Sequence, residues 1–201
     1  MAKTIITLGR EYCTGGRYIA KDVARALGIK LYDKELITMA AKNSGLSEEA
    51  VAASEKRHTH SLLYSLYTMG NDLPLGDQVF ILQSRIIKQL ADEGPCVIVG
   101  RCADVILKDY HPLNLFVYAN AESKIQRCID RAPEGEHLSR NDIARRMKQV
   151  DKNRAQYRQM FADSKWGAKE TYHLCVNTSG HQIKDLIPGL AAFVRCWYGE
   201  K

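Results

Sequence analysis

The chain has 201 residues, of which 45% are hydrophobic, enough to build one complete core, so a single domain covering residues 1–201 is expected. No apolar run is long enough to cross a membrane and the N-terminus lacks the layout of a signal peptide, which favours a cytoplasmic protein. The net charge of +6 and the pI near 9.0 fit either a nucleic-acid partner or a small anionic substrate. The position of the charges must decide between these two.

The chain opens with a predicted strand, a glycine turn and a helix. Residues 4–8 are largely apolar, and apolar residues later recur at spacings of three and four up to Leu27, where Gly28 can cap the helix. This layout is typical of a phosphate-binding loop, in which backbone N–H groups and the positive end of a helix surround an anion. The usual Gly-Lys-Ser/Thr ending is absent, because residues 15–18 read Gly-Gly-Arg-Tyr.

Strand-like and helix-like segments alternate along the rest of the chain, which predicts a parallel sheet with helices on both faces. A helical insertion is expected over residues 42–76, and its Tyr- and Leu-rich segment 62–67 would suit a homodimer interface. The further predicted strands are 29–33, 96–99, 113–118 and 174–176, and the further predicted helices are 34–42, 77–93, one beginning at Ser139, and 183–197.

The six cysteines show no pattern that indicates a metal site. No two stand at zinc-ligand spacing, and we therefore expect reduced, mostly buried thiols and no structural metal. These residues are Cys13, Cys96, Cys102, Cys128, Cys175 and Cys196.

Two charged residues follow predicted strands. Asp33 comes after the second strand and Arg101 after the strand 96–99. In open parallel sheets, ligands bind at the carboxyl ends of the strands, and the phosphate loop meets that same edge. We therefore expect Asp33, Arg101 and the loop to lie around one ligand site.

A second concentration of charge lies between residues 127 and 158. Arg154 falls within the apolar stripe of the helix that begins at Ser139, where its stem could simply cover apolar surface. Alternatively, Arg154 forms with Asp151 and Arg158 a charged face toward the active cleft, a role that suits the planar guanidinium fork. The basic residues of the segment are Arg127, Arg131, Arg140, Arg145, Arg146, Lys148, Lys152, Arg154 and Arg158.

Four motifs resemble those of the cytidylate kinase-like family, bacterial relatives of the nucleoside monophosphate kinases. They are residues 9–20, 32–37, 94–104 and 151–154, and the resemblance spans nearly the whole chain. It implies an α/β phosphate-loop fold, a parallel β-sheet sandwiched by helices, with 42–76 as the acceptor-binding insertion and 132–165 as an arginine-rich lid. It also implies transfer of the terminal phosphoryl group of ATP, bound with Mg²⁺, to a nucleoside monophosphate such as CMP or a similar anionic acceptor.

The resemblance also implies roles for individual residues. Gly16 falls where true cytidylate kinases have their phosphate-binding lysine, and Tyr18 falls where a metal-binding hydroxyl residue is usual. The nucleotide is expected on Glu11, Tyr12, Cys13, Thr14, Gly15, Gly16, Arg17 and Tyr18. The acceptor is expected on Asp33, Lys34, Arg101 and Asp104, and catalysis on Arg17, Arg127, Arg154 and Arg158.

The missing lysine leaves the activity open. Arg17 or Arg10 could supply the lost charge, and Asp104 or Asp33 could hold magnesium, whose ligands the sequence does not fix. The alternative is a non-catalytic nucleotide sensor that keeps the cleft without the chemistry. Nucleic-acid binding is disfavoured, because no basic run carries interleaved aromatic residues for stacking.

Overall fold

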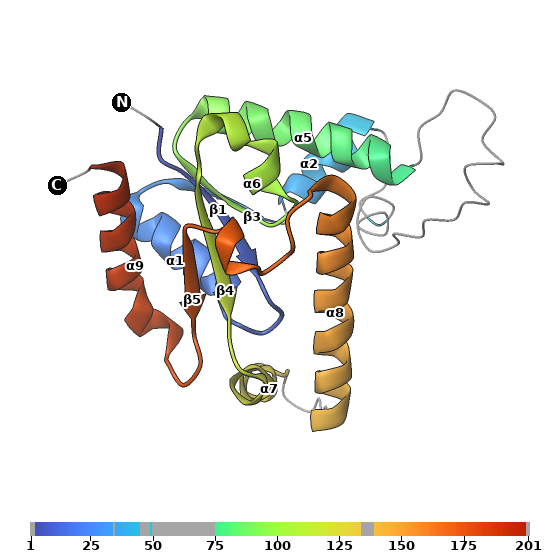
Figure 1. Ribbon diagram of the computed structural model, residues 1–201, viewed down its shortest axis with the longest axis vertical. Coiled ribbons are helices and arrows are strands. Elements are labelled where there is room, and N and C mark those ends of the chain that lie inside the picture. The colour runs from blue at the N-terminus through green and yellow to red at the C-terminus, as the bar shows by residue number, and fades with distance from the viewer. Residues whose placement is uncertain (1–2, 34, 45–48, 50–74, 134–138, 200–201) are drawn as a thin grey trace.

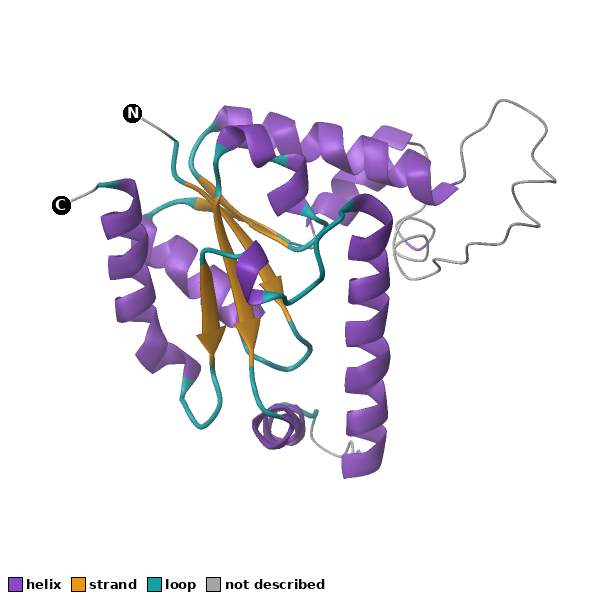
Figure 2. Ribbon diagram, in the orientation of Figure 1, coloured by secondary structure: helices purple, strands orange, loops and turns teal. Residues whose placement is uncertain are grey.

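The computed structural model describes residues 3–33, 35–44, 49, 75–133 and 139–199. Its centre is a sheet of five parallel strands in the order β2-β3-β1-β4-β5. Figures 1 and 2 show this sheet with helices packed around it. The predicted parallel sheet is therefore confirmed. The strands are β1 (Ile5–Arg10), β2 (Lys30–Tyr32), β3 (Cys96–Val99), β4 (Leu113–Tyr118) and β5 (Leu174–Asn177).

Helices cover both faces of this sheet. On one face, Ile6 and Leu8 of β1 pack with α1 (Gly16–Leu27) and α9 (Ile183–Tyr198). On the other, Ile5 packs with residues of α2 (Glu35–Ser44), α5 (Leu75–Glu93) and α6 (Ala103–Ile106). Successive side chains of a strand point to opposite faces, so these continuously apolar strands supply both halves of the core.

Two further helices complete the arrangement around the sheet. Helix α7 (Ala121–Asp130) follows β4, and α8 (Arg140–Phe161) stands alongside the sheet in Figure 1. Both begin at capping residues, because the side chains of Asn120 and Ser139 each accept a hydrogen bond from the backbone N–H three residues on. Helix α8 was predicted from Ser139, whereas α6 and α7 were not predicted. Two short 3-10 helices, Lys108–Tyr110 and Lys169–Thr171, complete the described elements.

The expectation of reduced thiols is wrong for two of the six cysteines. Cys13 and Cys128 form a disulfide across a sequence separation of 115 residues. The fold packs the β1–α1 loop against α7, which brings together two cysteines that the sequence spacing could not pair. Cys96 and Cys102 are buried free thiols, and burial raises the pKa of Cys102 to about 12.

Several predictions from the sequence concern residues that the structure does not describe. Lys34, most of the 42–76 segment and residues 134–138 of the 132–165 segment lie outside the described residues, as does the 62–67 segment. None of the described helices combines the length and apolar character needed to cross a membrane. Among the described residues, no group of three or more His, Cys, Asp or Glu side chains is placed to hold a metal ion.

Candidate active site

A cavity of about 800 Å³ lies at the carboxyl edge of the sheet. The ends of β1 and β3 form its floor, and α8 contributes one wall. Sequence reasoning expected Asp33 and Arg101 to share this edge, and both side chains line the cavity. So do six further charged residues, namely Arg10, Arg17, Glu49, Asp104, Arg154 and Arg158.

Asp33 is the meeting point of three arginines. Its buried carboxylate lies 3.7 Å from the Arg10 guanidinium (Oδ1 to Nη2) and forms an ion pair with Arg17 through Oδ2. Its backbone oxygen accepts a hydrogen bond from Nη1 of Arg101 at 2.8 Å. A single residue after β2 therefore positions cations from β1, from α1 and from the loop after β3.

The loop after β3 has an uncommon backbone. Gly100, Arg101 and Cys102 all lie in the left-handed region, with φ of 79°, 55° and 52°. A Cβ atom at Gly100 would overlap the Arg10 guanidinium, so a larger residue there would move that guanidinium from its present place. Non-glycine residues in this region cost about 1 kcal/mol or more each and cluster at functional sites. This strained backbone conformation places Arg101 beside Asp33.

The cavity carries an excess of positive charge. Five arginines line it, against the three carboxylates of Asp33, Glu49 and Asp104. Burial, followed by the nearby charge of Arg154, lowers the pKa of Arg10 to about 9, despite the opposing charge of Asp33. Arg10 remains protonated at neutral pH but is poorly compensated within the protein. An anionic ligand would supply the missing negative charge.

Arg158 joins α8 to the opposite side of the cavity. Only 4% of its side chain is exposed, and it donates to Asp104 Oδ2 at 2.8 Å and to the backbone and side-chain oxygens of Ser164 at 3.0 and 2.7 Å. Burial alone would lower the pKa of Arg158, but the hydrogen bond and charge of Asp104 outweigh it, so the pKa is raised. Arg158 and Asp104 thus form a largely buried pair that joins α8 to α6.

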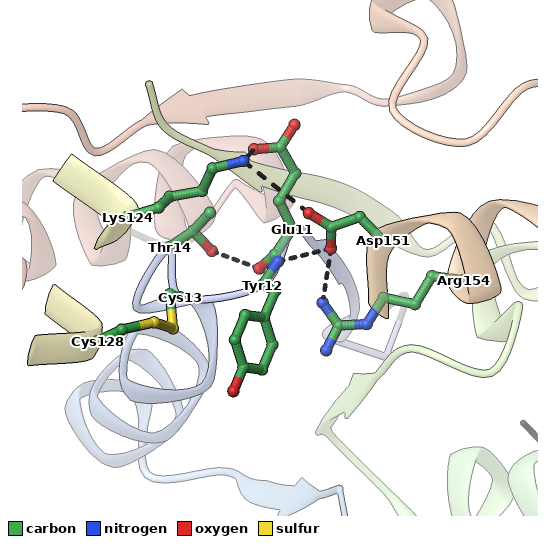
Figure 3. The surroundings of a disulfide bond; sticks show 8 residues. All are labelled: Glu11, Tyr12, Cys13, Thr14, Lys124, Cys128, Asp151 and Arg154. Carbon is green, nitrogen blue, oxygen red and sulfur yellow. Dashed lines mark hydrogen bonds and ion pairs between the residues drawn. A yellow bond between two sulfur atoms is a disulfide. The ribbon is translucent and has the colours of Figure 1, made fainter. Parts of the chain in front are cut away.

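A second charged cluster surrounds the phosphate loop, as Figure 3 shows. The Tyr12 N–H donates to Asp151 Oδ1 at 2.7 Å, and Arg154 Nη1 lies 3.2 Å from the same oxygen. Lys124 Nζ lies 2.8 Å from Glu11 Oε2 and 3.9 Å from Asp151 Oδ2. Burial raises the pKa of Asp151, although the Tyr12 hydrogen bond and the cations oppose the shift.

The loop between β1 and α1 contains residues in the left-handed backbone conformation, a feature that anion-binding nests share. Cys13 and Gly15 lie in the left-handed region, with φ of 57° and 82°. Among the described residues, neither of their amide groups has a hydrogen-bond acceptor. A Cβ atom at Gly15 would overlap the Ile183 side chain at the start of α9, so glycine is required here by packing as well as by φ.

Of the predicted nucleotide-binding residues 11–18, only Arg17 lines the cavity, and the predicted catalytic residue Arg127 lies away from it. Arg127 donates to the side-chain and backbone oxygens of Thr178 and to the backbone oxygen of His181, and it does not line the cavity. Tyr18 is 48% exposed, with the Arg131 guanidinium 4.2 Å from its ring centre. Their predicted roles in catalysis and nucleotide binding stay predictions.

Sequence reasoning missed Lys124 altogether. It lies on α7, a helix that was not predicted, and no motif marks its position. The capping residue Asn120 was the available signal, because Asn followed by a helix-forming segment is a common helix start. Even with that helix in place, only the fold shows that Lys124 points at the phosphate loop.

A parallel sheet with a glycine loop at the start of α1, and an arginine-lined cavity at the same edge, define a phosphate-loop protein of the kinase type. The chain belongs to the cytidylate kinase-like family, whose model matches residues 5–180. A search of curated proteins gives no match.

Solved structures agree with this class. A protein described as uncharacterized from Eubacterium ventriosum ATCC 27560 is 26% identical over 96% of this chain and 98% of its own, with a TM-score of 0.72. Shikimate kinase from Bacteroides thetaiotaomicron is 13% identical, covers 96% of this chain and 99% of its own, and has a TM-score of 0.56. Shikimate kinase from Acinetobacter baumannii in complex with shikimate is 14% identical over 98% and 94%, with a TM-score of 0.51. The two shikimate kinases share the fold.

Proposed function

We propose that the protein is a kinase that moves the terminal phosphoryl group of ATP to a nucleoside monophosphate or a similar anionic acceptor. One observation carries the proposal: a cavity of about 800 Å³, lined by five arginines and three carboxylates, adjoins the phosphate loop at the carboxyl edge of the sheet. Family membership supports phosphoryl transfer. The acceptor's chemistry is inferred from the charge excess of the cavity.

The proposed roles follow the two charged clusters. The loop from Glu11 to Arg17 surrounds the donor phosphates with its amides and the N-terminus of α1. Arg101, held by Asp33, binds the anionic acceptor in the cavity. Arg154 contacts the Arg10 backbone oxygen at 3.1 Å and lies between the clusters, where it can stabilise charge on the transferred group.

Magnesium would enter this site with the nucleotide. Asp33 and Asp104 are each paired with arginine, so neither offers a carboxylate free of a cation. Magnesium commonly binds through substrate phosphates and retains several waters, and this arrangement of residues fits that mode. The ion would neutralise phosphate charge, while the protein's own residues bind and align donor and acceptor and exclude water from the transfer.

One observation favours the alternative function, a nucleotide sensor without turnover. The loop lacks its lysine, and the Asp151 carboxylate already accepts the Tyr12 N–H. A protein with these features could bind nucleotide weakly and signal through movement of α8. This alternative shares the cavity and the loop with the kinase and differs only in chemistry.

A coupled phosphotransfer assay separates the two functions. The protein is given ATP and magnesium with a panel of nucleoside monophosphates, and ATP binding is measured in parallel by calorimetry. The kinase is supported by acceptor-dependent ADP formation at a rate well above ATP hydrolysis. Clear ATP binding without transfer to any acceptor of the panel would instead favour the sensor.

A further inference from the structure

The phosphate loop already holds one anionic group. The Asp151 carboxylate accepts the Tyr12 N–H at 2.7 Å and forms ion pairs with Arg154 Nη1 at 3.2 Å and with Lys124 Nζ at 3.9 Å (Figure 3). A backbone amide and two cations around one carboxylate form the type of environment that binds a phosphate oxygen. Asp151 comes from α8, a separate element, so the site does not depend on the loop's own acids.

Lys124 is built into this site rather than placed at its surface. Only 12% of its side chain is exposed, and Nζ contacts Glu11 Oε2 at 2.8 Å. Lys124 and Cys128 stand four residues apart on α7 and therefore share one face of that helix. The disulfide of Cys128 to Cys13 joins that face to the phosphate loop. The ammonium is thus held at the loop by a covalent link one helical turn away.

The other candidate cations serve the opposite side of the site. Arg17 is 50% exposed and forms its ion pair with Asp33. Arg10 also faces Asp33, and its guanidinium lies against Gly100 in the cavity. Neither forms an ion pair with Glu11 or Asp151. Among the described lysines, Lys124 is the one whose ammonium reaches the carboxylates at the loop.

We infer that Lys124 supplies from α7 the donor-phosphate cation that the loop sequence lacks, and that Asp151 occupies the phosphate position until the donor displaces it. This inference rests on the proposed kinase function and adds a catalytic residue to it. Phosphate oxygens of the donor take the place of the Asp151 carboxylate on the Tyr12 amide, within reach of Lys124.

The phosphoryl transfer needs no reactant other than ATP and the acceptor. An oxygen of the acceptor attacks the terminal phosphorus of ATP while the bond from that phosphorus to the bridging oxygen breaks. The electron pair of the broken bond remains on the β-phosphate of ADP. Negative charge grows on that leaving oxygen, and the Lys124 ammonium stabilises it.

The test combines binding and turnover. Affinities for the magnesium complexes of ATP and ADP, and for AMP, are measured by calorimetry on the parent, Lys124→Met and Lys124→Arg. Lys21→Met is the matched control, because it removes an exposed lysine from α1, the helix that the loop leads into. Thermal unfolding of each variant checks the fold.

We expect Lys124→Met to lose the preference for ATP and ADP over AMP. Lys124→Met should lower affinity for ATP and ADP at least tenfold while changing affinity for AMP less than twofold, and should lower kcat more than it raises the acceptor KM. Lys124→Arg should recover part of both losses. Lys21→Met should resemble the parent.

A double variant separates contact from simple charge balance. If Lys124 only neutralises Glu11, then Glu11→Gln added to Lys124→Met restores nucleotide affinity, and the inference is overturned. If Lys124 contacts the donor phosphates, the double variant stays defective. This variant also removes an unpaired carboxylate, so it keeps the test usable where Lys124→Met unfolds.

The two proposals fail in different ways. A parent that prefers ATP to AMP but transfers no phosphoryl group contradicts the kinase function, whereas loss of that preference in Lys124→Met still supports the lysine's contact with phosphate. A Lys124→Met protein that keeps the parent's preference and rate contradicts the inference and leaves the kinase standing. A parent without any preference for ATP over AMP also contradicts the inference.

Discussion

The two sides of the sheet edge differ in how their charges are partnered. Around the phosphate loop, Glu11 and Asp151 are matched by Lys124 and Arg154, and a disulfide fastens the loop to α7. Around the cavity, arginines outnumber carboxylates and the space is open. The loop side, proposed to bind the donor, is thus filled by the protein's own groups, while the cavity, proposed to bind the acceptor, carries an excess of positive charge.

This difference predicts how the binding of the two ligands should differ. Under the proposed assignment, a donor would compete with an internal carboxylate for the Tyr12 amide, and part of its interaction energy would be used to displace Asp151. An acceptor would meet arginines already oriented by Asp33 and would gain from compensating the buried charge of Arg10. Changes on the two sides should therefore affect different ligands and different measurements.

The largest expected effect is on stability, at the contact that holds the acceptor side together. Arg158→Ala leaves Asp104 as a buried carboxylate without its cation and removes two hydrogen bonds to Ser164. Breaking such a pair costs about 3–5 kcal/mol. Urea unfolding should show a loss of this size, whereas the exposed Arg145→Ala should change the free energy of unfolding by less than about 0.5 kcal/mol. A loss no greater than that of the control would mean that this pair does not hold α8.

Next in size is the effect of Arg101→Ala on the acceptor. Loss of one charge-assisted contact costs about 1.5–3 kcal/mol, so affinity for the acceptor monophosphate should fall roughly tenfold to a hundredfold. ATP affinity should hardly change, since Arg101 lies on the cavity side. Calorimetry with each ligand separately measures both, and equal weakening would show that the two sides are assigned in reverse.

Arg17→Ala should have a smaller effect and should show whether Arg17 acts on acceptor binding or on the transfer step. Its side chain is half exposed, and exposed ion pairs contribute less than about 1 kcal/mol. Because its partner is Asp33, the acceptor KM should rise a few-fold with kcat nearly unchanged. Steady-state kinetics decide: a drop in kcat with constant KM would make Arg17 the catalytic cation.

The smallest expected effect is a pH dependence of donor binding. Burial raises the pKa of Asp151, so its carboxylate takes up a proton at higher pH than an ordinary aspartate. As pH falls through that raised pKa, the internal anion loses its charge and competes less, and affinity for Mg·ADP should rise about two- to threefold relative to Asp151→Asn. Titration of both proteins with the same nucleotide cancels the nucleotide's own protonation. Parallel pH profiles would show that Asp151 does not compete.

The sequence predicted the sheet well for a physical reason. Central parallel strands are buried on both faces and read as continuous apolar runs, so 96–99 and 113–118 match β3 and β4. The strand-end rule likewise placed Asp33 and Arg101 at one edge, where they share a hydrogen bond. These are local patterns with a fixed geometric meaning.

What the sequence could not supply are contacts between distant segments. The pairing of Cys13 with Cys128 and the approach of Lys124 to Glu11 depend on where α7 packs, and α7 carries little apolar signal because none of its residues is fully buried. The partner of Arg158 was equally out of reach, because the burial of Arg158 depends on how α8 packs against Asp104 of α6. Side-chain partners across long separations require the folded structure.

The disulfide also restricts the conformations of the unfolded chain. By joining residues 115 positions apart, it closes a loop that contains β2, β3 and β4 and thus most of the central sheet. In the chain-entropy account, closing a loop of this length lowers the conformational entropy of the unfolded state, which stabilises the folded state by about 5 kcal/mol. The bond that fastens one small loop to one helix therefore shortens the search by which β1 and β4, neighbours in the sheet but far apart in sequence, come together.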